Sequence, residues 1–218
     1  PKQNSIMKYS HSSGQLAIER QEDLNQAVGF LEAGRAPKLE TIYLQVDRLE
    51  YESTRDLDRI VEFLKACSSS HPDHPLTLHL GTHVHGRPIE VPTHVVTCMI
   101  DALPGTWKGL ELYGIKLVGD MERLVEALRR QPVLEEFSFV RESYSATPIP
   151  LAACLSTLPS LKNIDFDFGR LEISDESKIN VATSFARIGR LEKLQMYSLP
   201  YGIDMHDLFA TLQVHTSL

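Results

Sequence analysis

The strongest constraint on the fold is a short apolar pattern that the chain repeats. Its first clear copy covers residues 39–49, LETIYLQVDRL, and has the form L-x-x-I-x-L-x-x-D-x-L. Ile42 and Leu44 alternate as they would in a strand, so both side chains point to one face. Copies begin near residues 39, 75, 107, 134, 161 and 191, at intervals of 36, 32, 27, 27 and 30 residues. Self-similarity at such a period indicates stacked repeats.

A helical pattern follows each copy. Apolar residues at i, i+3, i+4 and i+7 predict helices over residues 56–67, 93–103 and 121–128, and further ones near 151–158, 179–188 and 205–212. Asp120 is a candidate N-cap for the third of these. Another helix is expected over residues 20–33, ending at Gly34. Because strand–helix–strand crossovers are right-handed, successive strands should lie parallel in one sheet.

The repeated pattern, in register with intervening helices, resembles that of leucine-rich repeat proteins. A full helix in each unit resembles the ribonuclease-inhibitor-like branch of that family, and the likeness covers roughly residues 20–218. It implies an α/β fold, a right-handed leucine-rich repeat solenoid with a curved parallel sheet on its concave side and helices on its convex side. The family's usual Asn or Cys position is held here by Asp47, His83, Ile115, Glu142, Gly169 and Leu199. Of these, Asp47 is expected to stabilise the turn after its strand.

The repeats suggest two regions. Residues 1–34 should form an N-terminal segment with a capping helix or partial repeat, including a short edge strand at 6–9. Residues 35–218 should form six leucine-rich repeats. One more step of 27 residues from position 191 reaches Leu218, so we expect a fragment of a longer protein or an incompletely capped array.

Composition narrows the function. The 218 residues are 42% hydrophobic and carry a formal charge of −7, which excludes a disordered chain and disfavours nucleic acid as a partner. No apolar run approaches the roughly 18 residues of a membrane span, so no membrane association is expected. The three cysteines, Cys67, Cys98 and Cys154, lie in helix-like apolar patterns. Reduced core thiols, and hence an intracellular and cytoplasmic location, are expected.

The residues between the apolar strand positions should point into the concave face. The innermost column is then Tyr43, His79, Glu111, Ser138, Asp165 and Gln195, and the next is Gln45, Gly81, Tyr113, Val140, Asp167 and Tyr197. The columns mix tyrosine, which is favoured at interfaces, with acid. They predict a binding face for a protein or peptide with a basic or mixed surface, made by Tyr43, His79, Glu111, Tyr113, Asp165, Asp167, Gln195 and Tyr197. The alternative is that these residues merely tolerate solvent.

Two stretches could carry chemistry. Residues 71–85 hold five of the nine histidines, and His79, His83 and His85 could supply three zinc ligands. An exposed histidine-rich loop is the favoured interpretation. Asp165 and Asp167 share one strand face, as paired acids can, but a solvated acidic rim is favoured there. Trp107 stands at a template leucine position and is expected in the core.

No phosphate loop, catalytic triad or zinc-finger spacing is present, so no catalytic residue, metal ligand or cofactor is assigned. The leading hypothesis is a non-enzymatic interaction scaffold or recognition domain that binds a protein or peptide on its concave strand face. The second is a structural subunit or fragment of a larger multidomain assembly, with its oligomeric state open. The third is a metal-binding enzyme built on residues 71–85.

Overall fold

The fold is given by a computed structural model, which describes residues 7–36, 38–71, 74–82, 89–140, 148–167, 174–186 and 188–197. The main sheet has eight strands, in the order β1 (Lys8–Ser10), β2 (Gln15–Ile18), β3 (Thr41–Gln45), β4 (Leu76–Gly81), β6 (Trp107–Tyr113), β8 (Glu136–Val140), β9 (Asn163–Asp167) and β10 (Lys193–Tyr197). All neighbouring strands are parallel except β1 and β2, which are antiparallel. The α/β class and the parallel sheet are therefore confirmed.

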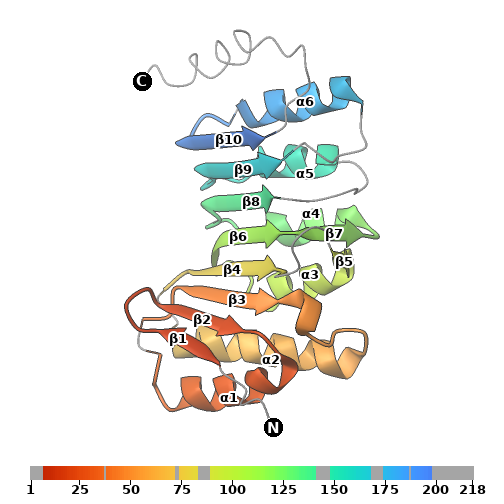
Figure 1. Cartoon of the computed structure of the whole chain (residues 1–218). Coiled ribbons are helices and arrows are strands. Elements are labelled where there is room, and N and C mark those ends of the chain that lie inside the picture. The colour runs from red at the N-terminus through yellow and green to blue at the C-terminus, as the bar shows by residue number, and fades with distance from the viewer. Residues whose placement is uncertain are drawn as a thin grey trace.

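Six helices alternate with these strands in the part of the chain that is described. They are α1 (Gln21–Glu32), α2 (Thr54–Ser70), α3 (Thr93–Asp101), α4 (Met121–Arg129), α5 (Pro148–Leu155) and α6 (Asp175–Ala186). Each helix contacts the next one along the chain. The helices therefore form a row beside the stacked strands (Figure 1).

Two ladders of apolar residues join the strands on one face of the sheet. The first joins Leu16, Ile42, Leu78, Leu110, Phe137, Ile164 and Leu194, and the second joins Ile18, Leu44, Leu80, Leu112, Phe139, Phe166 and Met196. All are buried except Leu194 and Met196, which are partly buried against the same core. Removing this apolar surface from water is the main force that holds the units together.

Trp107 lies in the core, as its template position predicted. The side chain is 1% exposed, and its Nε1 donates to the carbonyl oxygen of Ile100 at 3.0 Å. Gln131, a residue that the apolar pattern did not mark, is fully buried beside it. Its Nε2 donates to the same carbonyl at 3.2 Å and its Oε1 accepts from the Gly105 amide at 2.9 Å. These hydrogen bonds compensate the burial of a polar amide.

The helix boundaries differ from the predicted ones by a few residues at most. The start of α2 illustrates the physical reason for such a difference. It begins earlier than expected because Ser53 caps it, accepting from the Asp56 amide at 3.2 Å. The two helix-end signals are confirmed. Asp120 accepts from the Glu122 amide at 2.9 Å, and Gly34 has φ of 65° after α1. The helix expected at 205–212 lies outside the described residues.

The N-terminal region contains a strand that the sequence pattern missed. The expected edge strand is β1, but β2 follows it and pairs in parallel with β3. The turn between β1 and β2 ends at Gly14, whose φ is 61° and whose carbonyl accepts from the Glu40 and Thr41 amides. A Cβ there would lie 2.0 Å from the Lys38 carbonyl. The parallel sheet thus starts one strand earlier than expected.

A second, two-stranded sheet was also unexpected. It pairs β5 (Ile89–Pro92) in parallel with β7 (Ile115–Val118), which follows β6 after Gly114. Ile115, which the sequence pattern placed at a turn position after β6, is fully buried in this strand. Because each strand has only four residues, neither carries a clear alternation in the sequence.

Within the described residues, no helix combines the length and the apolar character needed to cross a bilayer.

Candidate functional site

The open face of the main sheet, opposite the apolar ladders, carries a continuous row of polar residues across six strands. Its members are consecutive Cα partners: Tyr43, His79, Glu111, Ser138, Asp165 and Gln195. All six are half-buried. The structure thus brings together the predicted innermost column, and we call it the polar row.

The second column is aligned in the same way but is more uneven. Gln45, Gly81, Tyr113 and Val140 are consecutive partners across β3, β4, β6 and β8, and Asp167 pairs with Tyr197 across β9 and β10. Tyr197 is 43% exposed and Asp167 is half-buried. Gln45 is only 9% exposed, so its side chain is more enclosed than a solvent-facing position suggests. Neither row contains Lys or Arg.

Aromatic and charged groups meet in the N-terminal half of this face. The Tyr43 and His79 ring centroids are 4.6 Å apart, and those of His79 and Tyr113 are 6.4 Å apart. His79 Nδ1 lies 2.6 Å from Oε2 of Glu111. The hydrogen bond from His79 lowers the pKa of Glu111, against the opposing effect of its burial. Burial raises the pKa of Tyr43, and the Glu111 charge adds to that effect, so Tyr43 stays a neutral phenol.

A hollow of about 290 Å³ lies over these rings, and we call it the aromatic hollow. Among the described residues it is lined by Ala17, Glu19, Tyr43, Leu44, Gln45, His79, Gly81, Thr82 and Tyr113. Gly81 makes room for it, because a Cβ at that position would lie 2.9 Å from His79 Nε2. The hollow therefore depends on the absence of a side chain at Gly81.

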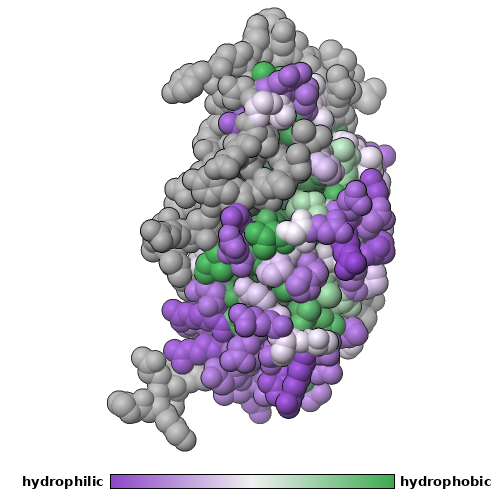
Figure 2. All heavy atoms as spheres, turned by 90° about the vertical axis from the view of Figure 1, so that its right-hand side faces the viewer, coloured by the Kyte–Doolittle hydropathy of each residue, from purple (hydrophilic) through white to green (hydrophobic). Residues whose placement is uncertain are grey.

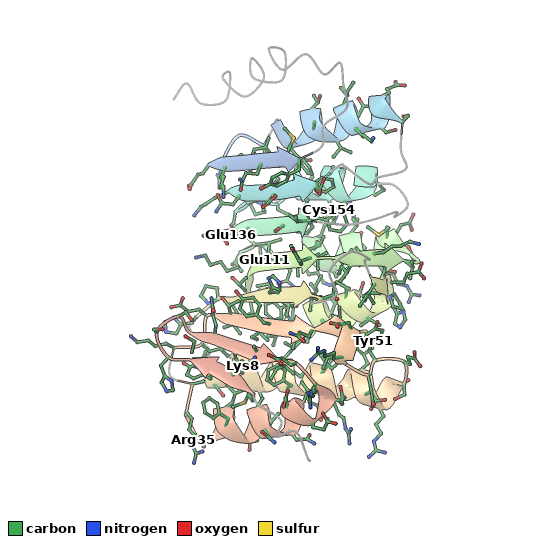
Figure 3. The ribbon with its side chains drawn as sticks, in the orientation of Figure 1. Lys8, Arg35, Tyr51, Glu111, Glu136 and Cys154 are labelled. Atoms are coloured by element: carbon green, nitrogen blue, oxygen red, sulfur yellow. The ribbon has the colours of Figure 1, made fainter. Side chains whose placement is uncertain are left out.

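A second hollow of about 350 Å³ lies farther along the polar row. Its polar lining residues are Glu111, Glu136, Ser138, Asn163, Asp165, Lys193 and Gln195. Figure 3 shows Glu111 on β6 and Glu136 on the neighbouring β8. Asp165 Oδ1 is buried without a hydrogen-bond partner in the described part of the chain. Burial raises the pKa of Asp165, although Lys193 opposes this effect. This hollow is acidic, with one cation at its side.

His71 and His79, two described histidines of the histidine-rich stretch, make separate side-chain contacts. His71 is 8% exposed, and its ring nitrogens contact the carbonyl oxygens of Cys67 at 3.2 Å and Ala36 at 2.5 Å. His79 contacts Glu111 instead, and His83 and His85 lie outside the described residues. Where the structure is described, no three His, Cys, Asp or Glu side chains form a group suited to a metal ion. The three-histidine zinc hypothesis stays untested.

The core interpretation of the cysteines holds for Cys67 and Cys154, which are fully buried. Cys154 Sγ donates to the Val125 carbonyl at 3.5 Å. Cys98 is partly exposed. Burial raises the pKa of all three thiols, so the reactive thiolate is scarce at neutral pH.

Asp47 lies in the turn after its strand, as expected, but one of its carboxylate oxygens makes no hydrogen bond among the described residues. It lies in a 3₁₀ turn, η1 (Val46–Arg48), directly after β3, and its side chain is 8% exposed. Its Oδ1 is buried without a hydrogen-bond partner among the described residues, and Arg48 Nε is 3.9 Å from Oδ2. The turn-stabilising hydrogen bond expected of this position is thus not made by Oδ1.

Figure 2 shows the side of the molecule that faces right in Figure 1. There, hydrophilic side chains gather over the N-terminal part and are interleaved with smaller hydrophobic areas higher up (Figure 2).

Comparison with models of known protein families and with curated proteins gives no significant match. The assignment of function therefore depends on the open face itself.

Proposed function

We propose that this chain is a leucine-rich repeat solenoid whose open strand face binds a protein or peptide without catalysing a reaction. The observation that carries the proposal is the polar row. Six side chains from six strands, Tyr43 to Gln195, lie in register on one half-buried surface. A partner could therefore contact every repeat at equivalent positions.

The solenoid part of the proposal is supported by how the units stack. From β2 to β10 the main sheet is parallel, and each helix contacts the helix of the next unit. A single strand and helix buries too little apolar surface to be stable alone. Stacked units share two apolar ladders, which is the arrangement expected of a repeat array.

The charge of the face indicates the kind of partner. Glu111, Asp165 and Asp167 lie on it, and its two rows lack Lys and Arg. At the margin of the face, Lys162 pairs with Glu135 at 3.0 Å. Electrostatic complementarity then favours a basic or mixed surface over an acidic one. Tyr43, Tyr113 and Tyr197 add rigid contact area at little entropic cost. The buried thiols suit the intracellular location expected from the sequence.

The proposal is tested by selecting binding peptides from a random display library on the folded wild-type protein. The peptides are then measured against the double charge reversal Asp165→Lys with Asp167→Lys. The matched control is Glu22→Lys with Glu62→Lys, which reverses two exposed acids on α1 and α2. We expect the open-face variant to lose at least tenfold in affinity while the control stays within twofold. Equal affinities for both variants, with unchanged melting temperatures, would refute the open face as the binding surface.

A further inference from the structure

The aromatic hollow has a chemistry more specific than that of the rest of the face. Building on the proposed function, we infer that it receives one cationic side chain, a lysine or arginine of the bound partner. The inference rests on the aromatic rings, on an unpaired acceptor and on the size of the hollow.

The rings come from three neighbouring strands and gather around one space. Tyr43 on β3, His79 on β4 and Tyr113 on β6 all line the hollow, with successive centroids 4.6 and 6.4 Å apart. A cation within about 6 Å of a tyrosine ring is attracted by the negative face of its π system. Two tyrosines around one hollow therefore favour a positive group over a neutral one.

Two acidic side chains lie at or near the hollow, and one of them, Glu19, already pairs with a lysine of the chain. Glu19 lines it, and Glu111 contacts His79 from the adjacent strand. Lys8 pairs with Glu19 at 2.5 Å from the edge strand β1, and its own side chain is 62% exposed. The chain thus places an ammonium group of its own beside one of these acids. The His79 ring contacts the Glu111 carboxylate, so an acid lies next to the imidazole at this side of the hollow.

Gln45 supplies the independent observation. The residue is 9% exposed and lines the hollow, and its Oε1 is buried without a hydrogen-bond partner in the part of the chain that the structure describes. An unpaired buried acceptor is unfavourable until a donor reaches it. Ammonium and guanidinium groups carry several N–H donors and no acceptor. A cationic side chain could satisfy Gln45 and contact the tyrosine faces together.

The volume sets the size of the occupant. About 290 Å³ is at the lower limit of the roughly 300–1,000 Å³ found for small-molecule pockets. One long side chain suits such a space better than a whole cofactor does. Gly81 keeps this space open, because a Cβ there would lie 2.9 Å from His79 Nε2.

The test uses the selected peptides and fluorescence anisotropy with the full chain. In each peptide the basic residues are replaced singly, lysine by norleucine and arginine by citrulline, which remove the charge and keep the length. We expect one such replacement to weaken binding at least tenfold to the wild type. The protein variants Tyr43→Leu and Tyr113→Leu each remove a π face but keep an apolar side chain. For these variants, the same replacement in the peptide should change the affinity less than threefold. Tyr43→Phe, which keeps the ring, should behave as the wild type.

The outcomes separate the two proposals. Peptides that bind the open face with no dependence on a basic residue would overturn the cationic site and leave the proposed function intact. Failure to obtain any peptide sensitive to the Asp165 and Asp167 reversal would overturn the proposed function, and the cationic site with it. Tyr43 and Tyr113 are both half-buried. The fold of either leucine variant is therefore checked by its circular dichroism spectrum and melting temperature. Gly81→Ala gives a third variant, expected to weaken binding of the charged peptide by narrowing the hollow.

Discussion

His79 Nδ1 lies 2.6 Å from Glu111 Oε2, although 32 residues separate them in the chain. They are Cα partners across β4 and β6, with β5 and α3 in the intervening segment. A shift of one residue in this register would turn Glu111 toward the apolar side of the sheet. The pair therefore depends on the correct pairing of β4 with β6 and contributes to the local charge of the open face.

This pair should make stability depend on pH. The pKa of Glu111 is lowered in the folded state by its hydrogen bond with His79. The ionised carboxylate therefore stabilises the fold above the unfolded pKa of about 4.3, and this contribution is lost as the pH falls through the lower folded value. We expect Glu111→Gln to lower the melting temperature by roughly 1–2 °C at pH 6, since a partly exposed pair contributes about 0.5 kcal/mol. The difference should be smaller in thermal scans at pH 3 than at pH 6.

The control for this prediction is Glu90→Gln. Glu90 pairs with Lys116 at 2.7 Å in the small sheet, but its side chain is 64% exposed. Such a pair contributes little, so its loss should leave the melting temperature nearly unchanged at both pH values. A Glu111→Gln effect that persists undiminished at pH 3 would mean that packing, and not the carboxylate charge, is responsible.

The ionised carboxylate of Asp165 should destabilise the folded state while it favours binding of a basic peptide. Burial raises its pKa in the folded state, so the folded chain binds this proton more tightly than the unfolded chain does. Between the two pKa values stability falls as the pH rises, and at neutral pH the ionised carboxylate is destabilising. Asp165→Asn should raise the melting temperature at pH 7 and weaken binding of a basic peptide. The thermal gain should shrink below pH 4, where the wild-type carboxyl is protonated. A lower melting temperature at pH 7 would contradict this account.

Trp107 offers a test of the core. Replacing it by leucine, the residue of the repeat pattern, leaves a cavity and removes the donor to the Ile100 carbonyl. We expect a loss of about 3 kcal/mol in the free energy of unfolding, measured by urea denaturation. Tyr197→Leu, at a 43% exposed strand position, should change it by less than about 0.5 kcal/mol. Similar losses for both variants would indicate that Trp107 is not tightly packed.

The three thiols should react in a defined order. Cys98 is partly exposed, whereas Cys67 and Cys154 are buried, and burial raises the pKa of each. With N-ethylmaleimide at pH 7, mass spectrometry should show Cys98 modified first and the other two protected until urea unfolds the chain. Modification of native Cys67 at the rate of Cys98 would show that the helix carrying it opens readily.

Much of the open face could be predicted because one pattern recurs. Ile42 and Leu44 mark the buried side of their strand, so Tyr43 between them must face the other way, and the same holds for His79 between Leu78 and Leu80. Parallel pairing of the strands then brings equivalent positions side by side. The alternation of strands and helices, the parallel sheet and the polar row all follow from that periodicity alone.

Tertiary structure alone decided the features that depend on distance between units. The strands β2, β5 and β7 have four residues each, too few for a clear alternation. Their positions are set by the strands with which they pair. The burial of Gln45, the contact of His79 with Glu111 and the room left by Gly81 arise where neighbouring strands set the spacing. Periodicity determines which way a side chain points, whereas its contacts depend on residues that lie tens of positions away in the chain.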